Sequence, residues 1–208
     1  MKKSIDEHAA RFDDVAAEYD DEHNQTDEYR AWVSLVLDHA RDALSGTETV
    51  LDVGCGTGAI GLSLAEDAGS VVFRDISEGM LDEARRKADE AGLTNVEFGE
   101  GTFREPNYDG PVDVVVSNFA MHHLSDEEKR EAIDVIAGLN PRRFVLGDVM
   151  FFGEPNPENP LYSPEVDDPA TVGMLADALT DAGFALTAVE MVHEQFGVLV
   201  AERSPNSG

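Results

Sequence analysis

The fold is decided by the stretch Thr49-Val50-Leu51-Asp52-Val53-Gly54-Cys55-Gly56-Thr57-Gly58. A short β-branched and apolar run leads into three glycines at alternate positions, and a second apolar run begins directly after them. This pattern predicts a strand, a tight loop and a helix. Glycine has no Cβ, so it can adopt positive φ and lets another molecule approach the backbone, while the first NH groups of the helix face that molecule. The stretch therefore predicts a ligand that lies against the main chain.

The glycines fit two different cofactor motifs. Read from Gly56, they match the dinucleotide fingerprint G-x-G-x-x-G, with Asp75 close to the expected spacing of about 20 residues. Read from Asp52, the pattern is Asp-x-Gly-x-Gly-x-Gly. A pyrophosphate there would face a carboxylate, and two like unit charges about 4 Å apart repel by roughly 4 kcal/mol at an effective dielectric of about 20. The same carboxylate attracts the ammonium of S-adenosylmethionine, so this cationic cofactor fits better.

Three stretches resemble motifs of the class I S-adenosylmethionine-dependent methyltransferases. Val50 to Gly58 resembles their first motif, Asp75 to Leu81 their second, and Val112 to Leu124 their fourth. Within the family, the chain is similar to the small-molecule branch of the menaquinone-biosynthesis type. The resemblance implies an α/β, Rossmann-like methyltransferase fold, in which a mostly parallel seven-stranded sheet has helices on both faces and ends in an antiparallel C-terminal hairpin.

The expected cofactor site draws on the ends of neighbouring strands. Gly54, Gly56 and Gly58 expose backbone to the methionyl part of S-adenosylmethionine, and Asp52 faces its ammonium directly or through water. Asp75 stands at the carboxyl end of the next strand, one βα unit further on. A carboxylate in that position is placed to accept both ribose hydroxyls.

Further cofactor contacts are implied by the resemblance. Tyr19 would border the cofactor, although it could equally be a core residue. Ile76 would pack against the adenine, and Asn118 would border the methionyl group and the transferable methyl. Thr102 replaces an aspartate that often binds the adenine amino group, and its hydroxyl can accept that bond more weakly. Phe103 would line the edge of the ring instead.

Two adjacent histidines, His122 and His123, follow the strand that ends at Asn118. Either could accept a proton from the substrate, because imidazole titrates near pH 6.5, and the alternatives are orientation of the substrate or packing within the loop. A metal site would require a third ligand, which the sequence does not indicate, and adjacent loop residues seldom converge on one ion. We therefore assign the pair as candidate catalytic residues and predict no bound metal.

The whole chain, 1–208, is predicted to form a single methyltransferase domain in four parts. Two amphipathic patterns, the first running from Phe12 to Tyr19, predict an N-terminal helical cap over 1–46. Residues 47–150 form the cofactor-binding core. Five prolines between 151 and 170 predict a lid loop across the mouth of the site, or a disordered insertion. Residues 171–203 form a C-terminal helix and hairpin.

The charge of the chain is extreme for a folded enzyme. It has 43 acidic and 15 basic residues, a formal net charge of −28, and a pI near 4.2. The acids are spread along the sequence, and in about 1 M salt the screening length falls to about 3 Å, so the composition indicates a halophile's cytoplasm. An acidic surface for a basic partner is the alternative, and it would gather the acids in one place. Such charge also repels nucleic acid.

The location of the protein follows from further absences in the sequence. Cys55 is the only cysteine, so an intrachain disulfide is impossible, which agrees with a reducing compartment. No apolar run is long enough to span a bilayer. We expect a cytoplasmic protein with a small-molecule substrate and neither a nucleic-acid nor a membrane partner.

The function that these features predict is S-adenosylmethionine-dependent methyl transfer to a small molecule by in-line displacement. Positioning and exclusion of water would supply most of the rate. An NAD-dependent oxidoreductase built on the Gly56 pattern and a non-catalytic S-adenosylmethionine-binding module remain as alternatives. Oxygen, nitrogen, sulfur and carbon acceptors are all compatible with the sequence.

Overall fold

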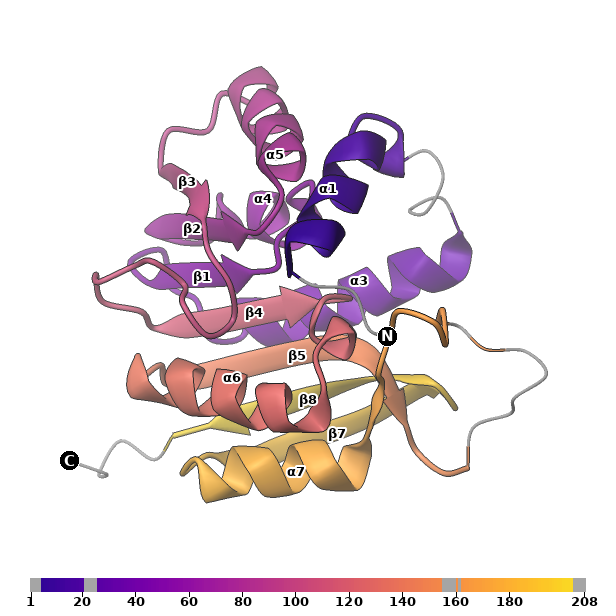
Figure 1. Ribbon diagram of the computed structural model, residues 1–208. Coiled ribbons are helices and arrows are strands. Elements are labelled where there is room, and N and C mark those ends of the chain that lie inside the picture. Colours follow the sequence, from indigo (N-terminus) through magenta and orange to yellow (C-terminus); the bar gives the residue numbers. More distant parts are fainter. Residues whose placement is uncertain (1–4, 21–25, 155–159, 161, 204–208) are drawn as a thin grey trace.

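The computed structural model describes residues 5–20, 26–154, 160 and 162–203. One twisted sheet runs through the molecule, with helices on both of its faces (Figure 1). The strands lie in the order β3-β2-β1-β4-β5-β8-β7, and a short β6 pairs with β5 outside this path. Their bounds are β1 (Thr49–Val53), β2 (Ser70–Asp75), β3 (Val96–Glu100), β4 (Val114–Asn118), β5 (Arg143–Phe151), β6 (Ala170–Thr171), β7 (Ala185–His193) and β8 (Phe196–Glu202).

The pairing of the strands confirms the predicted fold class. The neighbours from β3 to β5 are parallel to one another, whereas β8 is antiparallel to both β5 and β7. The chain moves outward from β1 through β2 to β3 and then returns to β4 on the other side of β1. Ligands of open α/β sheets bind outside the carboxyl ends of the strands at such a reversal.

Helices cover the two faces of the sheet in separate groups. α6 (Asp126–Gly138) and α7 (Val172–Asp181) lie in front of the sheet in Figure 1, and α3 (Asp27–Arg41) and α4 (Ala59–Leu64) lie behind it. The remaining helices are α1 (Ile5–Val15), α5 (Glu78–Glu90) and the short 3-10 helix η1 (Met121–His123). No helix in the described ranges is both long and apolar enough to span a bilayer.

The central strands are buried on both faces. On β1, Leu51 and Val53 pack into the cluster that includes Ile133 of α6, whereas Val50 packs into the cluster that includes Val36 of α3. A strand enclosed in this way is encoded by a continuous apolar run and not by alternation. The sequence signals for β1 and β4 were therefore strong.

The structure corrects three expectations about element bounds. The pattern from Phe12 to Tyr19 does not form one helix, because α1 begins at Ile5 and ends at Val15, and a turn follows. β5 continues to Phe151, into the region predicted as a lid. The two-residue β6, which the sequence did not indicate, pairs in parallel with the end of β5. The predicted lid, 151–170, falls partly outside the described residues, at 155–159 and 161.

The N-terminal segment is attached to the sheet by two aspartates. Asp13 Oδ1 accepts hydrogen bonds from Ser77 Oγ (2.6 Å) and Gly79 N (2.9 Å) at the start of α5. These bonds lower the pKa of Asp13. Asp20 accepts a hydrogen bond from Thr57 Oγ1 (2.7 Å) in the glycine loop and pairs with Lys87 of α5. Segment 5–20 is thus fixed across the carboxyl ends of β1 and β2.

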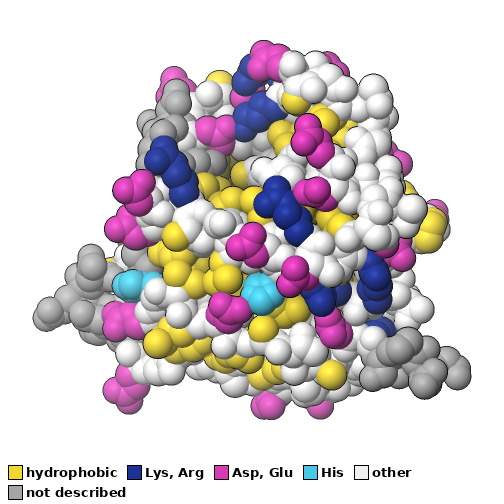
Figure 2. Space-filling model, turned by 180° about the vertical axis from the view of Figure 1, so that it is seen from behind, with side chains coloured by type: hydrophobic (Ala, Val, Ile, Leu, Met, Phe, Trp, Pro, Cys, Tyr) yellow, Lys and Arg dark blue, Asp and Glu magenta, His cyan; other side chains and the backbone are white. Residues whose placement is uncertain are grey.

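Acidic side chains are scattered over the surface. On the face shown in Figure 2 they lie among hydrophobic and basic side chains across the whole view and do not form one patch. Some pair with a nearby cation, such as Arg86, which lies 2.5 Å from both Glu83 and Glu90. This distribution agrees with the spread of acids along the sequence.

Replacement of Gly61 by alanine should destabilise the fold. A Cβ there would lie 2.3 Å from Phe73 Cε1 and 2.9 Å from Asp52 Oδ2, which forces the neighbours apart. Overpacking of this kind costs about 1–3 kcal/mol, which denaturant unfolding at fixed KCl would measure. The matched control is Gly138→Ala in α6, where a Cβ meets no atom within 4 Å and stability should be unchanged or slightly higher. Equal stability of the two variants would contradict the close packing of α4 on the sheet.

Candidate functional site

A cavity of about 770 Å³ opens at the carboxyl ends of the parallel strands. The loops after β1, β2 and β4 form its floor, and α1, α3 and the segment before β6 contribute its walls. Eleven of the twelve residues proposed from the sequence line it: Tyr19, Asp52, Gly54, Gly56, Asp75, Ile76, Thr102, Phe103, Asn118, His122 and His123. The topology therefore brings together residues that are more than 100 positions apart in the chain.

The glycine loop requires glycine at each of its three positions. Gly54, Gly56 and Gly58 have φ values of 68°, 51° and 87°, a region that side-chain-bearing residues rarely adopt. A Cβ on Gly54 would lie 2.5 Å from the Cβ of Ala120, whereas a Cβ on Gly56 would meet no atom within 4 Å. Gly56 thus presents open backbone to the cavity. Gly58 does not line the cavity but caps the start of α4, so its conformation serves the turn.

Two carboxylates lie beneath this loop. Asp52 is 1% exposed, and its Oδ2 accepts a hydrogen bond from Gly61 N (2.9 Å). Burial, together with the nearby charge of Asp75, raises the pKa of Asp52 to about 7. Asp75 accepts hydrogen bonds from Gly56 N (2.8 Å) and Ser77 N (2.9 Å), and burial raises its pKa also. Among the described residues neither acid makes an ion pair, so this end of the cavity carries uncompensated negative charge.

Asn118 offers an unused hydrogen-bond acceptor at the end of β4. Its Oδ1 is buried and has no hydrogen-bond partner in the described part of the chain. An unsatisfied buried acceptor costs about 1–3 kcal/mol, which a donor from a ligand or water would recover. The next residue, Phe119, has a φ of 54°, a conformation that non-glycine residues adopt mainly where the surroundings impose it. Its ring stacks on Tyr29, 5.8 Å away between centroids.

The proposed adenine contacts differ in their availability. Phe103 is buried beside Gly54, and Ile76 lies in the cavity wall. The Thr102 hydroxyl oxygen already accepts hydrogen bonds from Arg104 N (3.2 Å) and Glu105 N (2.9 Å). An adenine amino group would have to compete for that oxygen.

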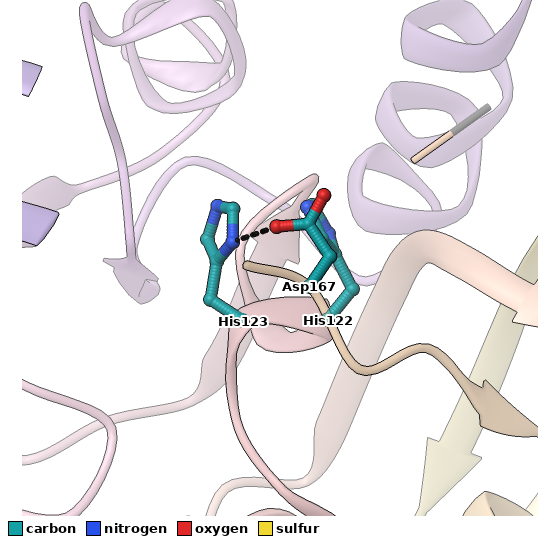
Figure 3. A group of neighbouring side chains, drawn as sticks. All are labelled: His122, His123 and Asp167. Carbon is teal, nitrogen blue, oxygen red and sulfur yellow. Dashed lines mark hydrogen bonds and ion pairs between the residues drawn. The ribbon is translucent and has the colours of Figure 1, made fainter. Parts of the chain in front are cut away.

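Each of the two adjacent histidines is paired with a carboxylate. His122 Nδ1 lies 2.6 Å from Asp148 Oδ1, and His122 N donates to Asp148 Oδ2 (3.0 Å). His123 Nδ1 lies 2.7 Å from Asp167 Oδ1, as Figure 3 shows. The two rings are 4.1 Å apart between centroids. η1 thus holds both side chains at the cavity wall, each oriented by a different acid.

The two imidazoles have opposite pKa shifts. Burial lowers the pKa of His123, and the carboxylate of Asp167 only partly offsets this effect. Burial also lowers the pKa of His122, but the charge and hydrogen bond of Asp148 outweigh it, so that this pKa is raised. Near neutral pH, His123 is therefore the neutral imidazole of the pair. The two histidines therefore differ in protonation state, a difference that the sequence alone does not predict.

The structure supplies the third potential metal ligand that the sequence did not indicate. One ligand atom from each of His122, His123 and Asp167 lies within 4.8 Å of the others, and the two histidines do converge. The Nδ1 atom of each histidine is engaged with a carboxylate, so a metal would have to bind Nε2 or displace these contacts. The absence of a metal stays a prediction, although the reason first given for it is wrong.

Several residues that line the cavity or contact its lining were not predicted from the sequence. His8 of α1 lies against His123, with ring centroids 5.1 Å apart, and Trp32 of α3 also lines the cavity. Asp148 could have been found, because it is a carboxylate near the carboxyl end of a predicted strand. Asp167 could not, because it lies in a proline-rich stretch without periodicity. The only cysteine, Cys55, is buried in the glycine loop, and burial raises its pKa, so the thiol stays protonated.

The fold and the cavity define a Rossmann-like domain with a cofactor site at the carboxyl edge of its sheet. Residues 50–139 match the family model described as a methyltransferase domain. An uncharacterized methyltransferase of Oceanobacillus iheyensis is 33% identical over 148 residues, 67% of this chain and 66% of the relative. The uncharacterized methyltransferase YrrT of Bacillus subtilis is 40% identical over 127 residues, 59% of this chain and 57% of the relative. The family match and these relatives confirm the methyltransferase class predicted from the glycine loop.

Solved structures extend the comparison to the whole fold. Magnesium protoporphyrin IX methyltransferase from Synechocystis PCC 6803, crystallised with bound S-adenosylmethionine, has a TM-score of 0.68 and 26% identity, covering 84% of this chain and 79% of that one. The [4+2]-cyclase SpnF has a TM-score of 0.79 at 17% identity, covering 97% of each chain, and shows likeness of fold alone. The match to the curated relatives named above spans about two thirds of their length or less.

The histidine pair should titrate in opposite directions from free imidazole. We expect the pKa of His123 to lie below 6.5 and that of His122 above it, because only Asp148 overcomes the effect of burial. Proton NMR titration of the imidazole Cε1–H signals measures both, with His122→Gln and His123→Gln assigning the resonances. Asp148→Asn should lower the pKa of His122, and His193→Gln, outside the cavity, is the control. A pKa of His122 that stays unchanged in Asp148→Asn would contradict this arrangement.

Proposed function

We propose that the protein is an S-adenosylmethionine-dependent methyltransferase that acts on a small molecule. The observation that carries the proposal is the grouping of two buried, unpaired carboxylates and one unused amide oxygen around open glycine backbone. Among the described residues no cation makes an ion pair with Asp52 or Asp75, so nothing beside these two acids is placed to hold a pyrophosphate. This composition suits a ligand that carries an ammonium, a sulfonium and a ribose.

Each cofactor contact has its own proposed residue. Asp52 would neutralise the ammonium, directly or through water, and Asp75 would accept hydrogen bonds from the ribose hydroxyls. Asn118 would border the methionyl group, while Gly54 and Gly56 let the ligand approach the backbone. Tyr19, Ile76, Phe103 and Thr102 would enclose the adenosine end. Gly58 supports this site through the turn that it forms and not through contact.

The rate would come mainly from positioning. S-adenosylmethionine supplies a methyl group on a sulfonium, which an acceptor can attack without a protein nucleophile. The walls formed by α1, α3 and the loops hold the acceptor and exclude water, and such approximation can contribute up to about 7–11 kcal/mol. The chain's own task is therefore to bind, to orient and to remove a proton where the acceptor has one.

His123 is the better candidate for the general base. Its imidazole is neutral near pH 7 because burial lowers its pKa. If Nδ1 carries the proton, it donates to Asp167, and Nε2 is then left as the acceptor for a substrate proton. His122 is held by two contacts to Asp148 and has a raised pKa, so we assign it the role of fixing η1 and the shape of the wall.

Two other functions remain as alternatives. An NAD-dependent oxidoreductase would place a pyrophosphate at the helix start, beside the buried Asp52. A module that binds S-adenosylmethionine without turnover would need the same cofactor site but not His123 or Asp167. Calorimetry with each cofactor separates the first alternative from our proposal, and methyl transfer from labelled cofactor to a metabolite extract separates the second.

S-adenosylhomocysteine should bind with an affinity that depends on Asp52. Because the pKa of Asp52 is about 7 in the free protein, a cationic ligand should release a proton on binding, and affinity should rise between about pH 6 and 8 before it levels off. Asp52→Asn should weaken binding by about tenfold or more and flatten the dependence on pH. Isothermal titration calorimetry measures both, with the exposed Asp134→Asn as the control. Binding of NAD in place of S-adenosylhomocysteine would refute the proposal.

Finer aspects of the assignment belong to the same proposal. The motif likeness supports the menaquinone-biosynthesis-type branch, and the single domain would comprise the cap, core, lid and C-terminal parts at the bounds given above. The composition supports a halophile and a cytoplasmic location, with no nucleic-acid or membrane partner. Dispersed acids repel each other at low salt and are screened at high salt.

Thermal stability should rise steeply with salt. We expect the melting temperature to increase from low KCl to about 1 M KCl, because screening weakens repulsion among side chains that total −28 in net charge. Calorimetric melts across the KCl series measure the effect. A series in sucrose at matched water activity is the control, since sucrose does not screen charge. A melting temperature that is independent of KCl would contradict the halophilic origin.

A further inference from the structure

One cationic side chain at the cavity has no acidic partner. Arg11 of α1 makes no ion pair with any described residue, although the sequence offers 43 acids for 15 bases. Every other lysine and arginine of the described ranges, except Arg203, pairs with a carboxylate. Arg203 is instead bound by the Asn140 side chain and the Ala182 carbonyl. Of these two described arginines without a carboxylate, only Arg11 lines the cavity.

The position of Arg11 connects it with the candidate site. It lines the main cavity, and with Tyr162 and Ser163 it also lines an adjoining recess of about 500 Å³. Its guanidinium lies 5.6 Å from the centroid of the Phe12 ring, a contact that orients the group without neutralising it. Phe12 in turn lies 5.5 Å from His123 between ring centroids. The cation is therefore one aromatic ring away from the proposed general base.

The surroundings of Arg11 limit the charge of a ligand. Glu165 lines the same recess, and Asp167 lies in the main cavity. One guanidinium can balance one negative charge, and these acids would repel a second. The fork of NH donors also matches the two oxygens of a carboxylate. Another part of the cavity lining is aromatic, formed by Tyr29, Trp32 and Phe119, whose rings contact one another.

We propose that Arg11 binds the carboxylate of the methyl acceptor, which is then a small monocarboxylic acid with an apolar or aromatic body. Only the ligand's role as methyl acceptor rests on the proposed function. Its binding through a carboxylate can be measured without methyl transfer. In this arrangement the carboxylate lies at α1, the body lies along the aromatic wall, and the nucleophilic atom is near His123.

The test compares carboxylates with neutral isosteres. Benzoate and phenylacetate are titrated against benzamide and phenylacetamide at fixed KCl, with and without S-adenosylhomocysteine. Trp32 is the only tryptophan and lines the cavity, so its fluorescence reports binding, and calorimetry confirms it. We expect each carboxylate to bind about tenfold more tightly than its amide, as a charge-assisted pair requires. Arg11→Gln should reduce that ratio to about one, and Arg11→Lys should retain part of it.

Controls keep the outcomes distinct. Arg30→Gln changes an exposed arginine of α3 that pairs with Asp27 and does not line the cavity, so the ratio should stay unchanged. Circular dichroism shows whether the Arg11 variants fold. Equal binding of carboxylate and amide, no binding of either up to about 10 mM, or an unchanged ratio in Arg11→Gln would overturn the proposal. Tighter binding of phenyl phosphate than of benzoate would also overturn it. Failure of S-adenosylhomocysteine to bind would refute the proposed function. The comparison of carboxylate with amide would still test whether Arg11 binds a carboxylate.

Discussion

The burial of two carboxylates beneath a backbone loop is the constraint on which the rest of the structure depends. Asp52 and Asp75 are held by backbone NH groups and not by cations, and burial raises the pKa of each. One of these donors, Gly56 N, lies in the glycine loop, which curls through positive φ and therefore requires glycine. The packing of α4 on the sheet and the start of α5 are tied to this arrangement through Gly61 N and Ser77 N. The energetic cost of burying two carboxylates without a cation falls at the place where a cationic ligand would reduce it.

The N-terminal segment completes the cavity that the sheet begins. Asp13 and Asp20 attach it to α5 and to the glycine loop through contacts between residues far apart in sequence. The same segment brings His8, Phe12 and Arg11 to the cavity. The cofactor half of the site is thus built from consecutive strand ends, whereas the other half is built by tertiary contacts of a helix. This division explains why similarity to the family model, which covers residues 50–139, points to the first half and leaves the acceptor open.

Sequence reasoning was strong where local pattern and topology agree. The apolar runs of β1 and β4, the alternate glycines and the carboxylate at the end of β2 each carry a local signal, and all of these elements lie where they were expected. Sequence-based prediction failed where contacts between distant parts of the chain determine the position of a residue. The hydrogen bond between His123 and Asp167 joins residues that are 44 positions apart, across a proline-rich stretch. No periodic sequence pattern predicts this contact. The bounds of α1 were wrong because the apolar spacing of Phe12 and Tyr19 reflects a shared cavity and not a shared helix.

The attachment of the N-terminal segment also determines where the folding unit can be cut. Similarity to the family is recognised over residues 50–139, which excludes α1, α3 and β5. A fragment trimmed to those limits would turn β4 into an edge strand with unpaired backbone groups and would uncover the apolar face that α3 now covers. Such a fragment would aggregate before it could bind anything. The boundaries that matter for expression are therefore set by hydrogen bonds between distant segments, and they lie well outside the region of recognisable similarity.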